Sequence, residues 1–447
     1  MQHTSNRPPN VRRTAWRLAA LGAAGVAAVL ALGTAGTAPF AQAATVTLNP
    51  LDPALGFNAF VEDQTVLAST EAEGPIATGG DLLIEGSYNV MIHTGTGSYT
   101  APGDSSPSAL VVGGRIDFGV DPATSVVQVL NGGYVKVGDL SDTDVLNTDQ
   151  NGASVNTRLV SEGAGYDSTP RVELTAQQPI SSVGPTSPID FDAAFAQLRE
   201  NSALLVGCAS TVTMRDASGA AVAKGQVAPG QQIRIDLEPG QTNVLEVTGE
   251  DLNNMADLVF PGVRPSADTP LLINVDTSGT GGEFDWVVAP QSPISIVESP
   301  YLLWNFGDTT RLRIAGGDTG QGSILAPNAD YSDVSPTNVE GQIIAKNASL
   351  GEVGENGGEI HHAPFSAELS CDSDVEPTPS DTPSTPANGP SDSTGPSSEG
   401  PGGNGGNGSL TTTGDSLRPL IIAAGALLAV GTVVLVVASR RKKAARG

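Results

Sequence analysis

The sequence predicts an all-β fold with one packed helix, in a solenoid-like arrangement similar to a parallel β-helix; a β-sandwich is the alternative. Three observations support this prediction. Short apolar runs meet a Gly-Gly pair at 79–80, 113–114 and 132–133 and continue as alternating strands. The chain contains 54 glycines but only 4% aromatic residues, a composition that suits thin, repetitive cores. One segment in the middle of the exported part has strong helical periodicity.

The first 43 residues have the pattern of a secretory signal peptide. A basic start is followed by an apolar stretch over 18–32, and the segment ends in Ala41-Gln42-Ala43. This A-x-A pattern predicts cleavage before Ala44. An uncleaved membrane anchor is the alternative, and the good cleavage pattern argues against it.

Residues 44–371 are predicted to form the extracellular domain. In its first third, strand alternation buries every second side chain, and the Gly-Gly pairs are expected to supply positive φ angles at the corners of the coils. Each coil would then cover the apolar face of its neighbour. Further strands are expected after the helix, at 211–216, 232–237, 244–248, 258–260, 271–275 and 294–297.

The predicted helix begins near Ser187. Ser187 can act as the N-cap, Pro188 suits the first helical position, Asp190 suits the positive N-terminal end, and Gly207 ends the helix. Its apolar stripe consists of Phe191, Ala194, Phe195, Leu198, Ser202 and Leu205. This stripe predicts that the helix packs against the sheet. The alternative is that the helix uses the stripe to bind a partner protein.

Several motifs, in this order along the chain, resemble the choice-of-anchor A domain of bacterial surface proteins. They are GFNAF at 56–60, EGPIATGG at 73–80, LLWNF at 302–306, GSILAPNAD at 322–330, VEGQIIAK at 339–346 and GEIHHAPF at 358–365. The resemblance spans roughly residues 48–371. It implies an extracellular, non-enzymatic surface role that is sometimes linked to adhesion, and it brings no catalytic residues.

The residues that could bind a ligand or a metal ion are explained more simply by structural roles. Trp304 and Phe306 alternate on a strand, which predicts a core wedge rather than a platform for a ligand. His361 and His362 lie beside Glu359, but adjacent strand residues point to opposite faces, so one histidine at most can join the carboxylate and no metal site is predicted.

An acidic loop at 138–152 is the other candidate for a metal ion. It holds Asp139, Asp142, Asp144 and Asp149, without the spacing of an EF-hand. A solvated loop is the simpler interpretation, with a Ca²⁺ site as the alternative. We therefore expect no cofactor.

Charge and motif content exclude other functions. The formal net charge is −26 at pH 7, and the basic residues are concentrated at the two ends of the chain, so the body is more acidic still. Such a field repels nucleic acid. The sequence has no P-loop and no nucleophile-elbow motif, and we expect no enzymatic activity.

The two cysteines, Cys208 and Cys371, both lie in the exported part. Outside the cell an even pair predicts a disulfide bond more often than two free thiols. This bond would tie the middle of the domain to its C-terminal edge. Sequence alone does not show that the two Cα atoms lie close enough.

Residues 372–409 are rich in Pro, Ser, Thr, Asp and Gly, and they cannot bury enough apolar area to fold. We expect a disordered stalk that gives the domain reach.

The segment 410–447 closes the chain. It contains Leu410-Thr411-Thr412-Thr413-Gly414, an uncharged apolar run over 419–438 and a basic tail. The run matches the length of a transmembrane helix, and the basic tail predicts a cytoplasmic end.

This order resembles the cell-wall sorting signal of Gram-positive surface proteins, with Thr411 in place of the usual proline. The resemblance implies that a sortase cuts between Thr413 and Gly414 and joins the Thr413 carboxyl to an amine of the peptidoglycan precursor. A plain membrane anchor is the alternative.

The sequence therefore predicts an exported adhesin-like or structural display module, anchored to the cell wall after a membrane-inserted precursor stage. Sortase and the peptidoglycan precursor are its expected partners, and a host or environmental glycan or matrix protein is its expected target. A secreted carbohydrate-active or wall-modifying enzyme is the alternative, and it would need paired carboxylates in a cleft.

Overall fold

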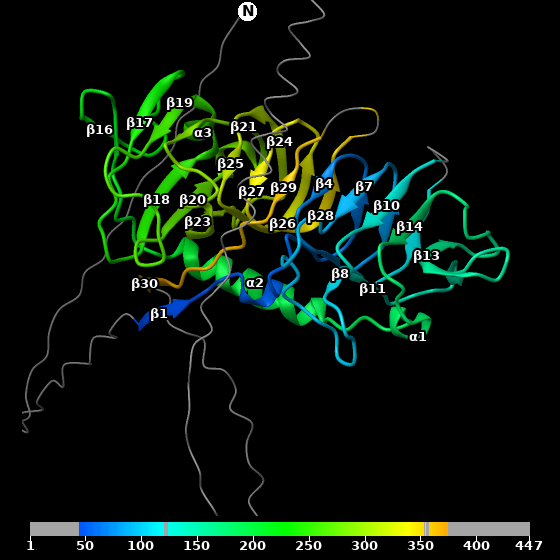
Figure 1. Ribbon diagram of the computed structural model, residues 1–447. Coiled ribbons are helices and arrows are strands. Elements are labelled where there is room, and N and C mark those ends of the chain that lie inside the picture. The colour runs from blue at the N-terminus through cyan, green and yellow to red at the C-terminus, as the bar shows by residue number, and fades with distance from the viewer. Residues whose placement is uncertain (1–43, 120–123, 353, 355–356, 374–447) are drawn as a thin grey trace, which may run out of the picture. The chain divides into compact units, whose positions relative to one another are not determined.

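Most strands of the domain pair in parallel, as the successive coils of a solenoid do (Figure 1). The computed structural model describes residues 44–119, 124–352, 354 and 357–373. Within them, the prediction of an all-β, solenoid-like fold with one packed helix is confirmed. The predicted C-terminal transmembrane helix lies outside the described residues.

The solenoid has three faces. The covered face comprises, in spatial order, β11 (Tyr134–Val137), β8 (Ser108–Val112), β5 (Ile76–Thr78), β2 (Ala59–Val61), β28 (Ile343–Leu350), β26 (Ser323–Asp333), β23 (Leu302–Asn305), β20 (Leu271–Asp276) and β18 (Asn243–Thr248). The second face comprises β9 (Ile116–Asp117), β6 (Leu82–Ile84), β3 (Thr65–Leu67), the ends of β28 and β26, β24 (Arg311–Gly317) and β21 (Glu283–Val288).

The third face comprises β12 (Thr143–Thr148), β13 (Ser154–Ser161), β14 (Arg171–Leu174), β10 (Val126–Val129), β7 (Tyr88–Val90), β4 (Glu71–Ala72), β29 (Ile360–His361), β27 (Val339–Glu340) and β25 (Gly320–Gln321).

A five-stranded sheet contains β16 (Ala221–Val222), β15 (Met214–Arg215), β17 (Gln231–Arg234), β19 (Met255–Val259) and β22 (Gln291–Ser292). The helices are α1 (Ile180–Val183), α2 (Phe191–Val206) and α3 (Gly249–Asn254), with short 3₁₀ turns at Asp52–Ala54, Ser278–Thr280 and Ser299–Tyr301.

The chain does not build the solenoid from one end to the other. It starts in the middle with β2 and moves outward through β5, β8 and β11. Helix α2 follows in the sequence, and the chain begins again at the far end with β18. It then winds back through β20, β23 and β26 to β28, which pairs in parallel with β2. We call this junction of the first and last coils the seam.

Helix α2 runs along the covered face (Figure 1). Asp190, and not Ser187, is the N-cap: its side chain accepts a hydrogen bond from the Ala193 N–H at 3.0 Å. The predicted start at Ser187 is therefore wrong. The Ser187 hydroxyl instead bonds the backbone of Ile189 in a local turn. The end at Gly207 is confirmed.

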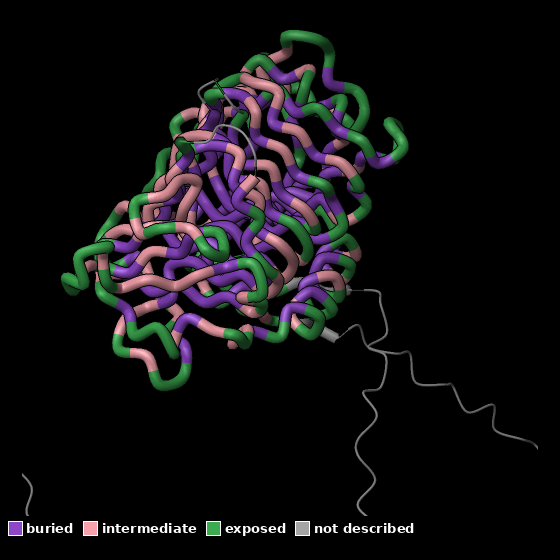
Figure 2. Tube along the Cα trace, turned by 90° about the vertical axis from the view of Figure 1, so that its right-hand side faces the viewer, coloured by how far each residue is buried: buried purple, intermediate pink, exposed green. Residues whose placement is uncertain are grey.

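Two apolar clusters lie on either side of the covered face. One fills the interior of the solenoid and includes Trp304 and Phe306, as predicted. The other lies between α2 and the sheet, where Phe60 stacks on Phe191 and Phe195 with ring centroids 5.2 and 5.5 Å apart. Figure 2 shows the buried positions inside the coils and the exposed ones at the turns. The predicted packing of the helical stripe is confirmed.

The glycine pairs serve a different purpose from the one predicted. Gly79 and Gly113 do not have positive φ angles. A Cβ atom on Gly79 would lie 2.2 Å from the Glu62 carbonyl oxygen, one on Gly113 2.2 Å from the Gly79 oxygen, and one on Gly138 1.9 Å from the Gly113 oxygen. Glycine is required here because successive coils approach backbone to backbone. Among the glycines of the three pairs, only Gly132 has the expected positive φ angle, which is +73°.

We predict that Gly113→Ala destabilises the domain by roughly 1–3 kcal/mol, because the added methyl group forces two coils apart. Gly279→Ala is the matched control, since a Cβ atom there meets no atom within 4 Å and its φ is not positive. Urea unfolding followed by circular dichroism measures both changes. Equal stabilities for the two variants would contradict the close-approach argument.

The edges of the domain are closed by side chains and by its own ends. Beside β11, the buried Gln178 side chain donates to the Val135 carbonyl and accepts from the Val135 N–H, both at 2.8 Å, as a neighbouring strand would. The first described strand, β1 (Ala44–Leu48), pairs with the last, β30 (Leu369–Ser373). Because the ends meet and both cores lie between them, residues 44–373 form a self-contained folding unit.

Candidate functional site

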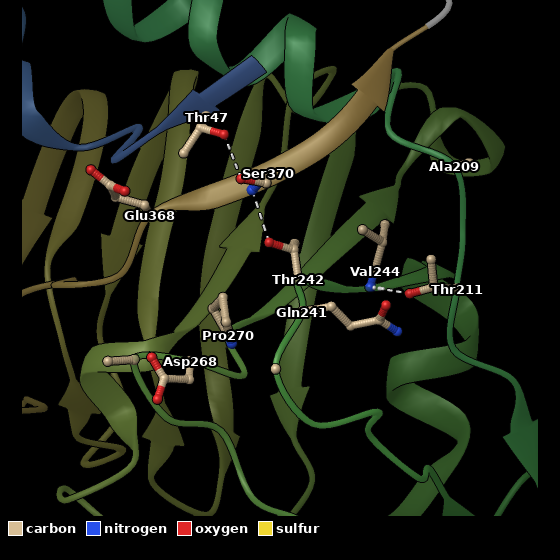
Figure 3. Close-up of a pocket in the computed structure, with 12 residues that line it drawn as sticks. Thr47, Ala209, Thr211, Gln241, Thr242, Val244, Asp268, Pro270, Glu368 and Ser370 are labelled. Atoms are coloured by element: carbon tan, nitrogen blue, oxygen red, sulfur yellow. Dashed lines mark hydrogen bonds between the residues drawn. The ribbon is translucent and has the colours of Figure 1, made fainter. Parts of the chain in front are cut away.

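A hollow of about 750 Å³ lies between the β1–β30 pair and the end coil of the solenoid (Figure 3). Five segments distant in sequence meet there. Its lining consists of Thr47, Ala209, Thr211, Gly240, Gln241, Thr242, Val244, Ala267, Asp268, Pro270, Glu368 and Ser370. We call it the terminal pocket. None of these residues was singled out by the sequence, because each lies in an ordinary strand end or loop without a motif.

Hydroxyl groups fix one wall of the terminal pocket. The Thr47 and Ser370 hydroxyls lie 2.5 Å apart, so β1 and β30 are joined by side chains as well as by their backbones. The Ser370 N–H donates to the Thr242 hydroxyl at 2.8 Å, and the Val244 N–H donates to the Thr211 hydroxyl at 2.9 Å (Figure 3). Each of these two threonines accepts a bond from the backbone and retains its own O–H as a donor.

Three other polar groups in the pocket are uncommitted. Asp268, Glu368 and Gln241 are exposed, and their side chains make no hydrogen bond or ion pair with any residue that the structure describes. The lining therefore offers carboxylate acceptors, an amide and hydroxyl donors. It contains no basic and no aromatic side chain. Such a surface favours a polar ligand without negative charge.

The histidine pair is a structural site at the seam. His361 Nδ1 lies 2.8 Å from Glu340 Oε1, and His361 Nε2 lies 3.0 Å from Glu359 Oε2 and 4.0 Å from Glu73 Oε1. The expectation that one histidine joins Glu359 is confirmed; Glu340 and Glu73 come from other coils and were not foreseen. Hydrogen bonds to Glu340 and Glu359 raise the pKa of His361 to about 9. Both ring nitrogens thus serve as donors to carboxylates.

The charge of His361 makes a pH-dependent contribution to stability. Since the folded pKa of about 9 exceeds the ordinary value of 6.5, the contribution is complete below about pH 6.5 and is lost as the pH rises through about 9. We predict that His361→Gln destabilises the domain at pH 6 and has a much smaller effect at pH 10. His93→Gln is the control, because the His93 side chain is 58% exposed and contacts only Glu73 among these carboxylates. A pH-independent difference measured by thermal unfolding would contradict this prediction.

The expectation of one acidic loop at 138–152 is wrong, because β12 occupies Thr143–Thr148 within it. Asp142 lies 3.4 Å from Arg115, and Asp144 accepts from the Gly163 N–H at 2.8 Å. Asp139 accepts from the Ser141 N–H at 2.9 Å, and Asp149 accepts from the N–H groups of Asn151 and Ala153 at 2.8 and 2.9 Å. These bonds lower the pKa of both aspartates. Within the described residues no cluster of three or more His, Cys, Asp or Glu side chains is arranged to hold a metal ion.

Cys208, directly after α2, is buried and disulfide-bonded. The other cysteine of the sequence, Cys371, lies in β30, where its backbone is paired with Val46 of β1. Its side chain lies outside the described part of the structure. The bond between these two cysteines stays a prediction, and peptide mapping of the unreduced protein is expected to recover one linked pair containing both. Recovery of either cysteine alkylated without reduction would contradict it.

Other predicted sites also lie outside the described residues. These are the signal cleavage site at Ala41, Ala43 and Ala44, of which only the backbone of Ala44 is described, the pentapeptide 410–414 and the apolar run 419–438. In the part that the structure does describe, no helix has the length and apolarity needed to cross a membrane.

Comparison with protein families gives one match. The sequence model of the family described as "Putative Ice-binding-like adhesive domain" matches residues 50–362, well over half of the chain. The chain belongs to this family. We call residues 44–373 the adhesive domain. No curated protein matches the chain.

Membership supports an extracellular surface location for the adhesive domain and agrees with the sequence-based expectation of an adhesin-like surface protein. The family match does not test the predicted resemblance to choice-of-anchor A domains. That relation and the sorting signal stay predictions.

Proposed function

We propose that this protein is a non-catalytic adhesin, exported by its signal peptide and held covalently at the cell wall through Thr413. The observation that carries the proposal is the family match to an adhesive domain over residues 50–362. The pattern of pentapeptide, apolar run and basic tail supports the anchoring step. The stalk at 372–409 would present the domain at a distance from the wall.

Anchoring is tested by mass spectrometry of the wall fraction. A peptide that ends at Thr413 and is linked to an amine of the peptidoglycan precursor is the expected result. An intact C-terminus in the membrane fraction would overturn wall anchoring in favour of the plain membrane anchor.

Adhesion is tested separately by deleting the gene and measuring attachment of the cells to glycan-coated and matrix-protein-coated surfaces. The deletion is expected to reduce attachment, and the protein expressed in trans should restore it. Unchanged attachment on every surface would count against an adhesive role.

The lining of the terminal pocket supports a binding role over the enzymatic alternative. Asp268 and Glu368 are both exposed, and neither is held in place by a hydrogen bond from a described residue. A glycosidase needs one carboxyl group kept protonated by its surroundings and a second one positioned across the scissile bond. We expect no cleavage of oligosaccharides during prolonged incubation with the adhesive domain.

The outward positions of the second face support attachment to a glycan or protein surface over attachment to ice. In register across that face stand Asp117, Leu83, Val66, Ser349, Ser332, Arg313 and Asp285. A face that repeated one kind of side chain across strands about 4.8 Å apart would present a regular array to a crystal lattice, whereas these residues change among acidic, apolar, hydroxyl and basic types. We expect no inhibition of ice recrystallisation.

A further inference from the structure

We infer that the terminal pocket binds a glycan that bears free amino groups, that is, a polymer of amino sugars whose nitrogens are not acetylated. This inference rests on the proposed adhesive function and names a ligand class for it. Hydroxyl donors, an amide and two unpaired carboxylates line a hollow of about 750 Å³ there.

The two carboxylates determine the charge of the ligand. Asp268 precedes β20 and Glu368 precedes β30, and both are exposed with no ion-pair partner among the described residues. Arg311 shows how the domain balances exposed carboxylates where a cation is at hand, since it pairs with Glu283 and Asp285 at 3.2 and 2.7 Å. An ammonium group on the ligand would supply the missing charge, whereas phosphate, sulfate or carboxylate groups would be repelled.

The remaining lining determines the class of molecule. The free O–H groups of Thr211 and Thr242 and the amide of Gln241 can donate to ring and hydroxyl oxygens of a sugar. A peptide would bind mainly by backbone pairing at a strand edge, such as that of β30, which pairs only with β1, and it would leave these side-chain donors unused. A polyhydroxylated amine therefore fits the lining better than a basic peptide.

The pocket has no aromatic platform and is open, so the affinity for one oligosaccharide is expected to be weak. Several copies on one cell surface would compensate by multivalent attachment. Because the attraction is between exposed charges, binding should weaken as the salt concentration rises.

The test compares two ligands with the same sugar backbone, one with free amino groups and one with neutral acetamido groups. The adhesive domain is titrated with the β-1,4-linked glucosamine tetramer and with the fully N-acetylated tetramer, and binding is followed by calorimetry or NMR. The expected result is binding of the amine form and at least threefold weaker binding of the acetylated form. Trilysine is titrated as a third ligand. Equal binding of the two tetramers, or binding of trilysine without binding of either tetramer, would overturn the inference.

The variant that tests the residues is the double change Asp268→Asn and Glu368→Gln, which removes charge and keeps shape. It should weaken binding of the glucosamine tetramer about three- to tenfold without altering the melting temperature, because exposed charge pairs are individually modest. Asp308→Asn is the control, since Asp308 is also exposed and lies outside the pocket. An undiminished affinity in the double variant would place the binding elsewhere.

The two hypotheses fail in different ways. If deletion of the gene abolishes cell attachment while the double variant still attaches normally, the adhesive function stands and the pocket assignment falls. If the domain binds the glucosamine tetramer through Asp268 and Glu368 while deletion leaves attachment unchanged, the ligand class stands and the adhesive function falls.

Discussion

Replacing Asn58 by alanine is expected to destabilise the domain by roughly 3–5 kcal/mol. The fully buried Asn58 side chain lies at the seam, where its amide group donates to the carbonyls of Gly341 at 2.7 Å and His361 at 3.1 Å. Its oxygen accepts from the Gly74 N–H at 2.8 Å. Alanine would leave the Gly341 carbonyl and the Gly74 N–H without partners in the interior, whereas the His361 carbonyl keeps two backbone N–H donors. Each buried unsatisfied group costs about 1–3 kcal/mol.

The control for this prediction is Asn253→Ala. Asn253 also bonds two backbone groups, Asp285 C=O and Val287 N–H, but it does so at the surface, where water can replace it. Its loss should cost at most about 1 kcal/mol. Chemical unfolding of the purified domain measures both variants. Similar losses for Asn58→Ala and Asn253→Ala would show that the seam does not depend on the buried amide.

Asp333→Asn is expected to stabilise the domain, and increasingly so as the pH rises from about 4 to about 8. Burial raises the pKa of Asp333 to about 8, whereas the free side chain has a value of 3.8. The folded state therefore retains a proton that the unfolded state has released, and rising pH favours unfolding throughout this window. One pKa unit corresponds to about 1.4 kcal/mol, so the difference reaches a few kcal/mol near pH 8.

The surroundings of Asp333 explain why its charge is disfavoured. Asp333 is 1% exposed, its Oδ1 atom has no hydrogen-bond partner, and the Tyr331 hydroxyl donates to Oδ2 across a long 3.3 Å. Asparagine has the same shape and no charge to bury. Thermal unfolding of both proteins at pH 5 and pH 8 provides the measurement. A difference that is constant with pH, or that is larger at pH 5, would contradict the assignment.

The sequence predicted the local structure well where one residue type controls it. Alternating apolar residues identified most of the strands and the inward position of Trp304 and Phe306, and helical spacing identified the stripe of α2. The strand expected at 294–297 is wrong, because turns occupy that segment. The start of helix α2 was misplaced because Ser187, Pro188 and Asp190 are all good N-terminal residues. The N-cap is the residue whose side-chain oxygen accepts a hydrogen bond from a backbone N–H of the first helical turn, and this depends on the path of the backbone.

The roles of the glycine pairs and the partners of His361 could not be predicted from local sequence. Gly79 and Gly113 are required by a neighbouring coil, so their own sequence context could not distinguish close approach from a positive φ. The partners of His361 include Glu340, on β27, and Glu73, directly after β4; these two strands flank β29 on the third face. No spacing in the sequence indicates which coils will be neighbours.

By itself, the sequence determined a strand-rich, acidic solenoid with one packed helix, because side-chain periodicity is a property of neighbouring residues. Only the tertiary structure decided the order of the coils. Asn58 bonds Gly341 across 283 positions because the chain restarts beyond α2 and winds back to its own beginning. The terminal pocket depends on the same route, since β1, β30 and the end coil meet only after the seam has closed. Such contacts follow from the path of the backbone in space, which local periodicity does not encode.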